Sequence, residues 1–253
     1  MSQEKNFDKY KVRGSMHWRE MTSRDPRIFN AYQQARYDWI IKLSGDVRGR
    51  KILDLGCGDG CLVYLLVKNG GLVTGVDNDE LGIKFANENL ASRLKNSKSN
   101  YRFVCSSVYD LPFPENSFDL VISSEVIEHL KEPNRLLAEA KRVLKSSGKI
   151  ILTTPYRLTE TPGDHNHVKE YYPEELKKNL GEYFADVNFK LTHHMLWRSL
   201  YTYAFRHFGN RPLGRWFINI PAVLFGWNPF MFGYKKTTKF DLFTIISIWG
   251  RKK

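Results

Sequence analysis

The sequence predicts an α/β fold with a doubly wound, mostly parallel sheet of seven strands. Three observations predict it. An apolar run, residues 52–55, enters a glycine-rich turn and then a helical pattern; short apolar runs alternate with helical segments as far as Thr154; and two more strand patterns lie nearer the C-terminal end. Strands that alternate with helices indicate a parallel sheet covered by helices on both faces.

The helices are predicted from apolar residues that recur every three or four positions. Gly45 and Gly49 end the first predicted helix. Pro133 stands where a later helix can start, and Gly148 ends that helix. The predicted helices span residues 28–43, 61–69, 80–92, 133–147 and 173–180, and a short helix is expected over 125–130.

The strands are predicted from short apolar runs bounded by turn residues. A polar turn over residues 95–100 precedes the third strand, a turn over residues 110–114 precedes the fourth, and Pro155 stops the fifth. The predicted strands span residues 51–55, 72–76, 101–105, 118–123, 149–154, 187–191 and 243–248.

Size and composition favour a cytoplasmic protein. A length of 253 residues suits one domain with an elaboration, and 42% hydrophobic residues can build its core. Cys57, Cys61 and Cys105 have no paired spacing, which fits a reducing compartment, and the polar N-terminus shows no signal-peptide pattern. The best apolar stretch, residues 217–232, is interrupted by asparagine and proline and is not expected to span a bilayer.

The positive charge is concentrated in one segment near the C-terminal end. The net charge is +12, and seven cations fall between Thr192 and Phe240 without a single Asp or Glu. They are Arg198, Arg206, Arg211, Arg215, Lys235, Lys236 and Lys239, and aromatic residues are frequent among them. We therefore expect a flexible N-terminal segment over residues 1–25, a main domain over 26–191 and 241–253, and a basic aromatic insertion over 192–240.

The glycine-rich turn has an unusual spacing. A dinucleotide site is marked by G-x-G-x-x-G, whereas this turn reads Asp54-x-Gly56-x-Gly58-x-Gly60. Asp77 follows the next strand, where an acid can hold ribose hydroxyls. This pattern resembles that of the class I S-adenosylmethionine (SAM)-dependent methyltransferases; a tight turn in some other α/β domain is the alternative.

The resemblance covers about residues 32–179 and the last strand, and it implies a Rossmann-like sheet with an antiparallel edge hairpin. It implies that Asp54 and the three glycines form the first SAM motif and that Asp77, with Asn78 beside it, holds the ribose. Ser107 and Val108 stand where the family often has an adenine-binding Asp, and Ser124 matches a cofactor contact after the fourth strand. These residues therefore make up the expected cofactor site.

Arg36 lies where ubiquinone-pathway O-methyltransferases carry an arginine near the methionine carboxylate, and a guanidinium suits a carboxylate. A solvated charge on a helix is the alternative for Arg36.

A second group of candidates is Glu125, Glu128 and His129. On a helix they would stand at i, i+3 and i+4 and could share one face. With His167, in the loop after Pro155, they resemble the E-x-x-E-H metal site that a later histidine completes in small-RNA 2′-O-methyltransferases. Two carboxylates and two imidazoles could bind Mg²⁺, Mn²⁺ or Zn²⁺, which would lower the pKa of an acceptor hydroxyl.

Without a metal, His129 or His167 would be the proton acceptor, with Glu128 in support. His193 and His194 lack such a context and are expected to be structural or surface residues.

The basic aromatic insertion has three interpretations. It could be a lid over the substrate, a surface that docks on an anionic membrane, or a nucleic-acid surface. The apolar stretch from Ile218 to Trp227 favours the first two over RNA.

The sequence therefore predicts a SAM-dependent methyltransferase that acts on a hydroxyl of a small-molecule, lipid-linked or glycan acceptor, in the cytoplasm or at the inner membrane face. An RNA 2′-O-methyltransferase and a non-catalytic SAM-binding protein are the alternatives.

Overall fold

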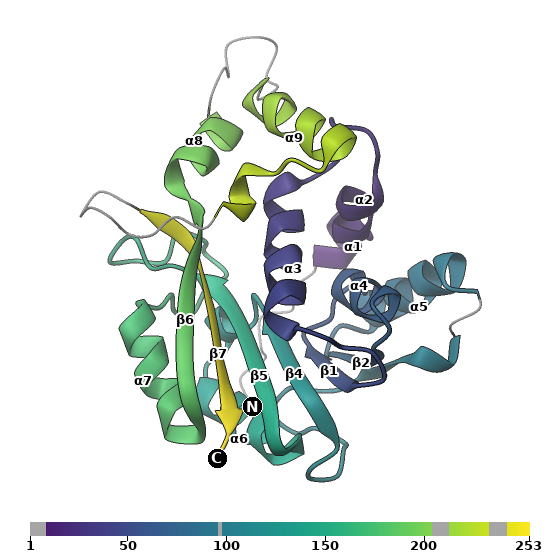
Figure 1. Cartoon of the computed structure of the whole chain (residues 1–253), viewed down its shortest axis with the longest axis vertical. Coiled ribbons are helices and arrows are strands. Elements are labelled where there is room, and N and C mark those ends of the chain that lie inside the picture. Colours follow the sequence, from purple (N-terminus) through teal and green to yellow (C-terminus); the bar gives the residue numbers. More distant parts are fainter. Residues whose placement is uncertain (1–8, 96–97, 204–212, 233–241) are drawn as a thin grey trace.

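The computed structural model describes residues 9–95, 98–203, 213–232 and 242–253. Its centre is a seven-stranded sheet with the order β3-β2-β1-β4-β5-β7-β6 (Figure 1). The strands are β1 (Lys51–Leu55), β2 (Leu72–Asp77), β3 (Tyr101–Cys105), β4 (Phe118–Ser124), β5 (Leu144–Pro155), β6 (Phe184–His194) and β7 (Phe243–Lys252). The first five pair in parallel, and β7 is antiparallel to both β5 and β6. The predicted fold class is confirmed.

Helices cover both faces of this sheet. One face carries α6 (Pro133–Val143) and α7 (Pro173–Tyr183), and the other carries α3 (Ala31–Ser44), α4 (Cys61–Lys68) and α5 (Glu80–Arg93). Successive side chains of β1 point to opposite faces of the sheet, so both helical layers pack against this strand. Ile52 contacts the α3–α5 layer, whereas Leu53 and Leu55 contact the α6–α7 layer. Three 3₁₀ turns, η1 (Lys98–Asn100), η2 (Ile127–His129) and η3 (Pro229–Met231), complete the described elements together with four helices introduced below.

Helix α6 ends earlier than the sequence predicts. Leu144, expected on its apolar face, already has extended backbone angles and pairs with Phe118 of β4. The apolar spacing continues past the helix because Leu144 is buried in the same core from the strand. Strand β5 therefore starts five residues before the predicted Lys149.

The N-terminal segment differs from the flexible stretch that we expected. From Lys9 onward it forms α1 (Lys9–Arg13) and α2 (Met16–Thr22), whereas residues 1–8 lie outside the described ranges. Trp18 is 9% exposed and packs edge-on against Tyr64 of α4, with ring centroids 5.1 Å apart. Two isolated aromatic residues, Tyr10 and Trp18, thus fix a segment that is otherwise polar.

The described part of the basic aromatic insertion folds onto the first turns of α3. It consists of α8 (Met195–Tyr203), α9 (Leu213–Phe225) and η3. Asn219 is fully buried and donates to the carbonyls of Pro26 and Phe29, while its oxygen accepts from the Ala31 N–H. Of its seven cations, Arg206, Arg211, Lys235, Lys236 and Lys239 lie outside the described residues. Among the described residues, no helix has the length and apolar character to cross a bilayer.

His193 is a structural residue, as the sequence predicts. It is fully buried at the end of β6 with a φ of +60°, and its ring contacts the Tyr32 carbonyl at 2.9 Å and the Thr192 hydroxyl at 3.0 Å. Burial lowers the pKa of His193 to about 3, so the ring stays neutral in the fold.

We expect this buried histidine to make the protein less stable in mild acid. The unfolded chain takes up a proton near pH 6.5 and the folded chain does not, so the free energy of unfolding falls with pH below 6.5, by at most about 1.4 kcal/mol per pH unit. Asparagine tolerates a positive φ. In urea titrations at pH 5.0 to 6.5, His193→Asn should therefore show a shallower pH dependence than the wild type; equal slopes would contradict this.

Candidate functional site

The turn between β1 and α4 is held against the end of β2. The N–H groups of Gly56 and Cys57 both donate to the Val76 carbonyl, at 2.8 and 3.0 Å. Gly56, Gly58 and Gly60 have φ angles of +75°, +53° and +85°, which glycine adopts without strain. A Cβ at Gly56 would also collide with Val126. The turn thus presents bare backbone at the carboxyl edge of the sheet.

Asp77 is the last residue of β2 and is hydrogen-bonded to this turn. One carboxylate oxygen accepts from the Gly58 N–H at 2.8 Å, and the other accepts from the Asp79 N–H at 3.0 Å. Asn78 follows on the surface. Asp77 pairs with Cys105 of β3, which places Ser107 and Val108 after the neighbouring strand end. The predicted ribose and adenine residues therefore come from adjacent strand ends.

Two buried polar atoms near the turn have no hydrogen-bond partner among the described residues. They are Oδ2 of Asp54, the second-last residue of β1, and Nε of Arg36, on α3. Burial, and then the charge of Asp77, raise the pKa of Asp54 well above its usual range. An acceptor and a guanidinium donor thus remain available for a polar ligand.

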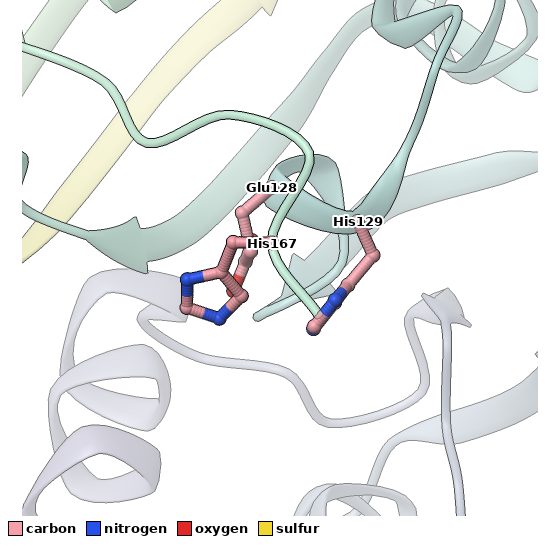
Figure 2. A group of neighbouring side chains, drawn as sticks. All are labelled: Glu128, His129 and His167. Carbon is pink, nitrogen blue, oxygen red and sulfur yellow. The ribbon is translucent and has the colours of Figure 1, made fainter. Parts of the chain in front are cut away.

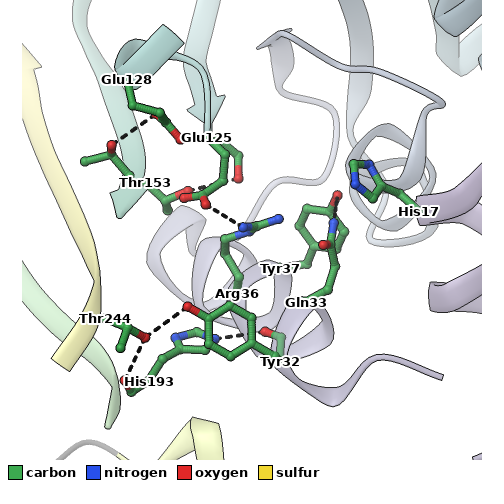
Figure 3. A network of polar contacts seen from close by, with 12 residues as sticks. His17, Tyr32, Gln33, Arg36, Tyr37, Glu125, Glu128, Thr153, His193 and Thr244 are labelled. Carbon is green, nitrogen blue, oxygen red and sulfur yellow. Dashed lines mark hydrogen bonds and ion pairs between the residues drawn. The ribbon is translucent and has the colours of Figure 1, made fainter. Parts of the chain in front are cut away.

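Arg36 is buried and forms an ion pair with Glu125, with an N–O distance of 2.8 Å (Figure 3). The interpretation of Arg36 as a solvated helix charge is therefore wrong. Glu125 follows β4 with a φ of +57°, and its N–H donates to the Thr153 carbonyl at 2.9 Å. Ser124, the residue before it, shares a hydrogen bond with the Thr153 hydroxyl at 2.9 Å.

Glu125→Gln should destabilise the protein by about 3 kcal/mol, because it leaves the buried Arg36 charge without its counter-ion. The free energy of unfolding from urea titration measures this. Glu132→Gln is the matched control, since Glu132 pairs with Arg135 on the surface and its loss should change stability by less than about 0.5 kcal/mol. Equal effects of the two substitutions would show that the buried pair has no special role.

Glu128, His129 and His167 converge at the carboxyl ends of β4 and β5 (Figure 2). Each offers one ligand atom, and these atoms all lie within 4.8 Å of one another. Glu128 is fully buried, and one of its oxygens accepts from the Thr154 hydroxyl at 3.0 Å. The rings of His129 and His167 meet edge-on with centroids 5.0 Å apart.

The predicted helix over residues 125–130 is wrong, and with it the shared face of Glu125, Glu128 and His129. Only η2, residues Ile127–His129, is helical, because Glu125 turns off β4 in the left-handed conformation. Glu125 consequently points to Arg36 and is not part of the cluster. The carboxylate that contacts the cluster in its place is that of Glu170, which hydrogen-bonds to His167. The sequence analysis missed Glu170, although it stands three residues after His167.

The hydrogen bonds of the two histidines define their neutral tautomers. His129 Nδ1 lies 3.1 Å from the Asn166 carbonyl, and His167 Nδ1 lies 2.8 Å from a Glu170 carboxylate oxygen. A carbonyl or carboxylate accepts, so each Nδ1 carries the proton and the lone pair lies on Nε2. Burial is the main cause that lowers the pKa of His129, while burial and the charge of Glu125 raise the pKa of Glu128. A neutral His129 imidazole therefore stands beside a buried carboxyl.

Helices α1 and α2 cover the glycine turn. The Tyr10 hydroxyl lies against Gly58, and its ring would come within 2.9 Å of a Cβ at Gly82. Asp59, in the turn, accepts from the Trp18 N–H at 2.9 Å and from the Ser15 hydroxyl at 3.2 Å. No motif in residues 9–22 identifies these contacts, so sequence reasoning could not find them.

A separate hollow is lined by Lys51, Thr74, Arg102 and Phe113, among others. It lies toward the amino ends of β1 to β4, whereas the glycine turn, Asp77 and the histidine cluster lie at the carboxyl ends. The polar ligand site of a parallel sheet is expected at the carboxyl edge. This hollow is therefore not part of the candidate site.

The sheet order, the glycine turn and the acid after β2 together define a Rossmann-like methyltransferase fold. Residues 53–152 match the family model of the methyltransferase domain. Among solved structures, the SAM complex of phosphoethanolamine N-methyltransferase 2 from Haemonchus contortus has a TM-score of 0.68 at 16% identity, covering 100% of this chain and 60% of that one.

Sequence relatives agree with this class. A probable SAM-dependent methyltransferase of Mycobacterium tuberculosis is 29% identical over 135 residues, which cover 53% of this chain and 46% of that protein. The ubiquinone biosynthesis O-methyltransferase of Bordetella avium is 30% identical over 149 residues, which cover 58% of this chain and 59% of that protein. The chain spans about half the length of the curated relatives it matches. Over these residues the chain is similar to SAM-dependent methyltransferases, and residues 53–152 match their domain, as the resemblance of the glycine turn predicted.

Proposed function

We propose that this chain transfers a methyl group from SAM to a hydroxyl oxygen of a small-molecule, lipid-linked or glycan acceptor. The observation that carries the proposal is the cluster of Glu128, His129 and His167. It follows β4, which pairs with β1, so it shares the carboxyl edge with the glycine turn. A hydroxyl has to lose its proton during transfer, and an imidazole at this edge could take it.

The charges at the turn suit the zwitterionic methionine end of SAM. The unpaired Asp54 oxygen can accept from the ammonium group, and Arg36 Nε can donate to the carboxylate. Asp77, with Asn78 beside it, would hold the ribose, Ser107 and Val108 would contact the adenine, and Ser124 would also contact the cofactor. The resemblance implies these assignments, and the positions of the residues at the ends of β2 to β4 support them.

The chemistry is an in-line displacement. The acceptor oxygen forms a bond to the methyl carbon as the carbon–sulfur bond breaks, and S-adenosylhomocysteine leaves with the electron pair of that bond. The hydroxyl proton passes to Nε2 of His129 or His167, and Glu128 stabilises the resulting imidazolium. Positioning the oxygen, carbon and sulfur in one line accounts for most of the catalysis.

The same cluster fits a divalent metal ion. Glu128 Oε1 is buried and has no hydrogen-bond partner among the described residues, and both histidines present Nε2 with Nδ1 held by Asn166 or Glu170. Glu128, His129 and His167 would hold the ion; Glu125, which we expected as a fourth ligand, is engaged by Arg36. Two imidazoles and one carboxylate suit Zn²⁺ or Mn²⁺ better than Mg²⁺. Such an ion would polarise the acceptor oxygen.

Incubation of the protein and methyl-labelled SAM with extracts of the source cell tests the function. We expect label in a product that resists alkaline hydrolysis, as a methyl ether does and a methyl ester does not. Label in RNA would instead support the 2′-O-methyltransferase alternative. SAM binding without transfer to any fraction would support a non-catalytic SAM-binding protein. Full activity after exhaustive chelation would exclude an essential metal.

A further inference from the structure

The insertion exposes a concentration of large apolar side chains. Nine of the fifteen exposed large hydrophobic side chains among the described residues lie between positions 196 and 242. They are Leu196, Leu200, Trp216, Phe217, Leu224, Phe225, Trp227, Phe232 and Leu242. We call them the insertion face. Apolar side chains gathered in this way on a protein surface mark an interaction site.

The two helices of the insertion are apolar on both of their sides. On α8, Trp197 and Tyr201 pack inward against α3 residues, whereas Leu196 and Leu200, also four positions apart, are exposed. On α9, Ile218 and Ala222 face the core, whereas Phe217 and Leu224, seven positions apart on another side of the helix, are 70% and 65% exposed. The buried apolar side chains of each helix are covered by packing within the fold, whereas the exposed apolar side chains would be covered only by a partner outside the fold.

The insertion face is held in a fixed position. Asn219 joins α9 to the segment before α3, and Asn228 donates to the Ala31 carbonyl at 2.8 Å, beside η3. The Trp39 indole N–H donates to the Phe230 carbonyl at 3.3 Å. Figure 1 shows α8 and α9 together at one end of the molecule, beyond the top of α3. The exposed side chains therefore stand on an anchored platform.

The charge of the insertion selects the partner. Seven cations and no acid occur between Thr192 and Phe240, which supplies more than half of the net charge of +12. Of the two cations that the structure describes, Arg198 on α8 lies over the Tyr32 ring and Arg215 on α9 pairs with Glu20, whereas the other five contribute to this charge by sequence alone. Aliphatic and aromatic side chains that insert between headgroups, with cations around them, are typical of surfaces that lie on anionic bilayers. RNA would use the cations and stack on the aromatics but would leave the leucines without a role.

We propose that the insertion face docks on an anionic lipid membrane, with α8 and α9 in the interfacial region. The proposal stands on the insertion alone and does not depend on the proposed reaction. It also has a geometric consequence. His194 pairs with Phe243, and Ile245 pairs with Pro155 at the carboxyl end of β5, so the insertion leaves and rejoins the sheet at the edge that carries the histidine cluster. Docking would turn that edge toward the membrane, where a lipid-linked acceptor is found.

Flotation with vesicles tests the proposal directly. The full-length protein is mixed with phosphatidylcholine vesicles that contain 30% phosphatidylglycerol or none, at low and at high salt. We expect binding only to the anionic vesicles. The triple substitution Leu196→Ser, Leu224→Ser and Phe225→Ser should lower the partition coefficient at least tenfold, as should Lys235→Glu with Lys236→Glu and Lys239→Glu.

Two matched controls keep the test specific. Leu72→Ser removes an exposed leucine at the amino edge of the sheet, and Lys84→Glu with Lys177→Glu and Lys178→Glu reverses three exposed cations on α5 and α7. Both controls should float like the wild type, and SAM binding by calorimetry should be unchanged in all variants. The proposal fails if the protein does not bind anionic vesicles at low salt. It also fails if the serine variant binds them normally, or if only single-stranded RNA is bound and the lysine variant alone loses it.

Discussion

Asp77→Ala should lower the affinity for SAM by at least about 100-fold. The substitution removes a carboxylate that can accept from the ribose hydroxyls, and hydrogen bonds to a charged group contribute about 1.5–3 kcal/mol each. It also releases the Gly58 N–H, so the glycine turn loses its tie to the end of β2. Both effects weaken the same site, and isothermal titration calorimetry measures the result.

Asp79→Ala is the matched control for this loss. Asp79 lies two residues further on, and its side chain caps α5 by accepting from Leu81 and Gly82. Its replacement should lower the stability of the protein by about 1 kcal/mol while leaving SAM affinity within about threefold of the wild type. An equal loss of affinity in the two variants would show that Asp77 acts through the fold and not by contact with the cofactor.

The second large effect is expected in the cluster. Of His129→Ala and His167→Ala, the one that removes the proton acceptor should lower the rate of methyl transfer by about 10²–10⁴-fold, the usual contribution of general base catalysis, with SAM affinity unchanged. Single-turnover kinetics with labelled SAM measures the transfer step. Because burial lowers the pKa of His129, its ring is protonated only below pH 6.5, and activity should persist below that pH on the acidic side of the profile.

His194→Ala is the control for the cluster. His194 ends β6 and its Nδ1 accepts from the Leu196 N–H, away from Glu128 and His167. Its loss should leave the transfer rate within about twofold of the wild type. If His129→Ala and His167→Ala also transfer at the wild-type rate, neither ring takes the proton and the proposed O-methyl transfer loses its base. If added Zn²⁺ or Mn²⁺ restores chelated enzyme, the cluster acts through a metal ion.

The sheet could be predicted because its signals are local. The run from Ile52 to Leu55 is buried on both sides, and the glycines after it are required by positive φ angles and by the close approach of Val126. Because each of these requirements is met by one residue type at one position, it can be recognised in the sequence. The edge hairpin was expected from the resemblance, and the order of the strands was not predicted, since pairing between distant strands leaves no comparable mark in the sequence.

The site was predicted only in part because its contacts are long-range. The spacing of Glu125, Glu128 and His129 suggests a helix face, but Glu125 adopts a left-handed conformation and pairs with Arg36, 89 positions earlier. Glu170 orients His167 through a loop whose path no periodicity describes. The two N-terminal helices were missed because a short polar segment with Tyr10 and Trp18 looks unstructured until its partners are known.

The contact of Tyr10 with Gly58 and Gly82 has a consequence for the rate at which the cofactor enters and leaves. A cofactor whose sugar lay at Asp77 would be covered by α1 and α2, so loading and unloading would require these helices to detach from Asp59 and from the turn. Spent S-adenosylhomocysteine then dwells in the protein for as long as that detachment takes. Strong product inhibition and a turnover limited by release are the expected signature, and trimming residues 1–22 should relieve both.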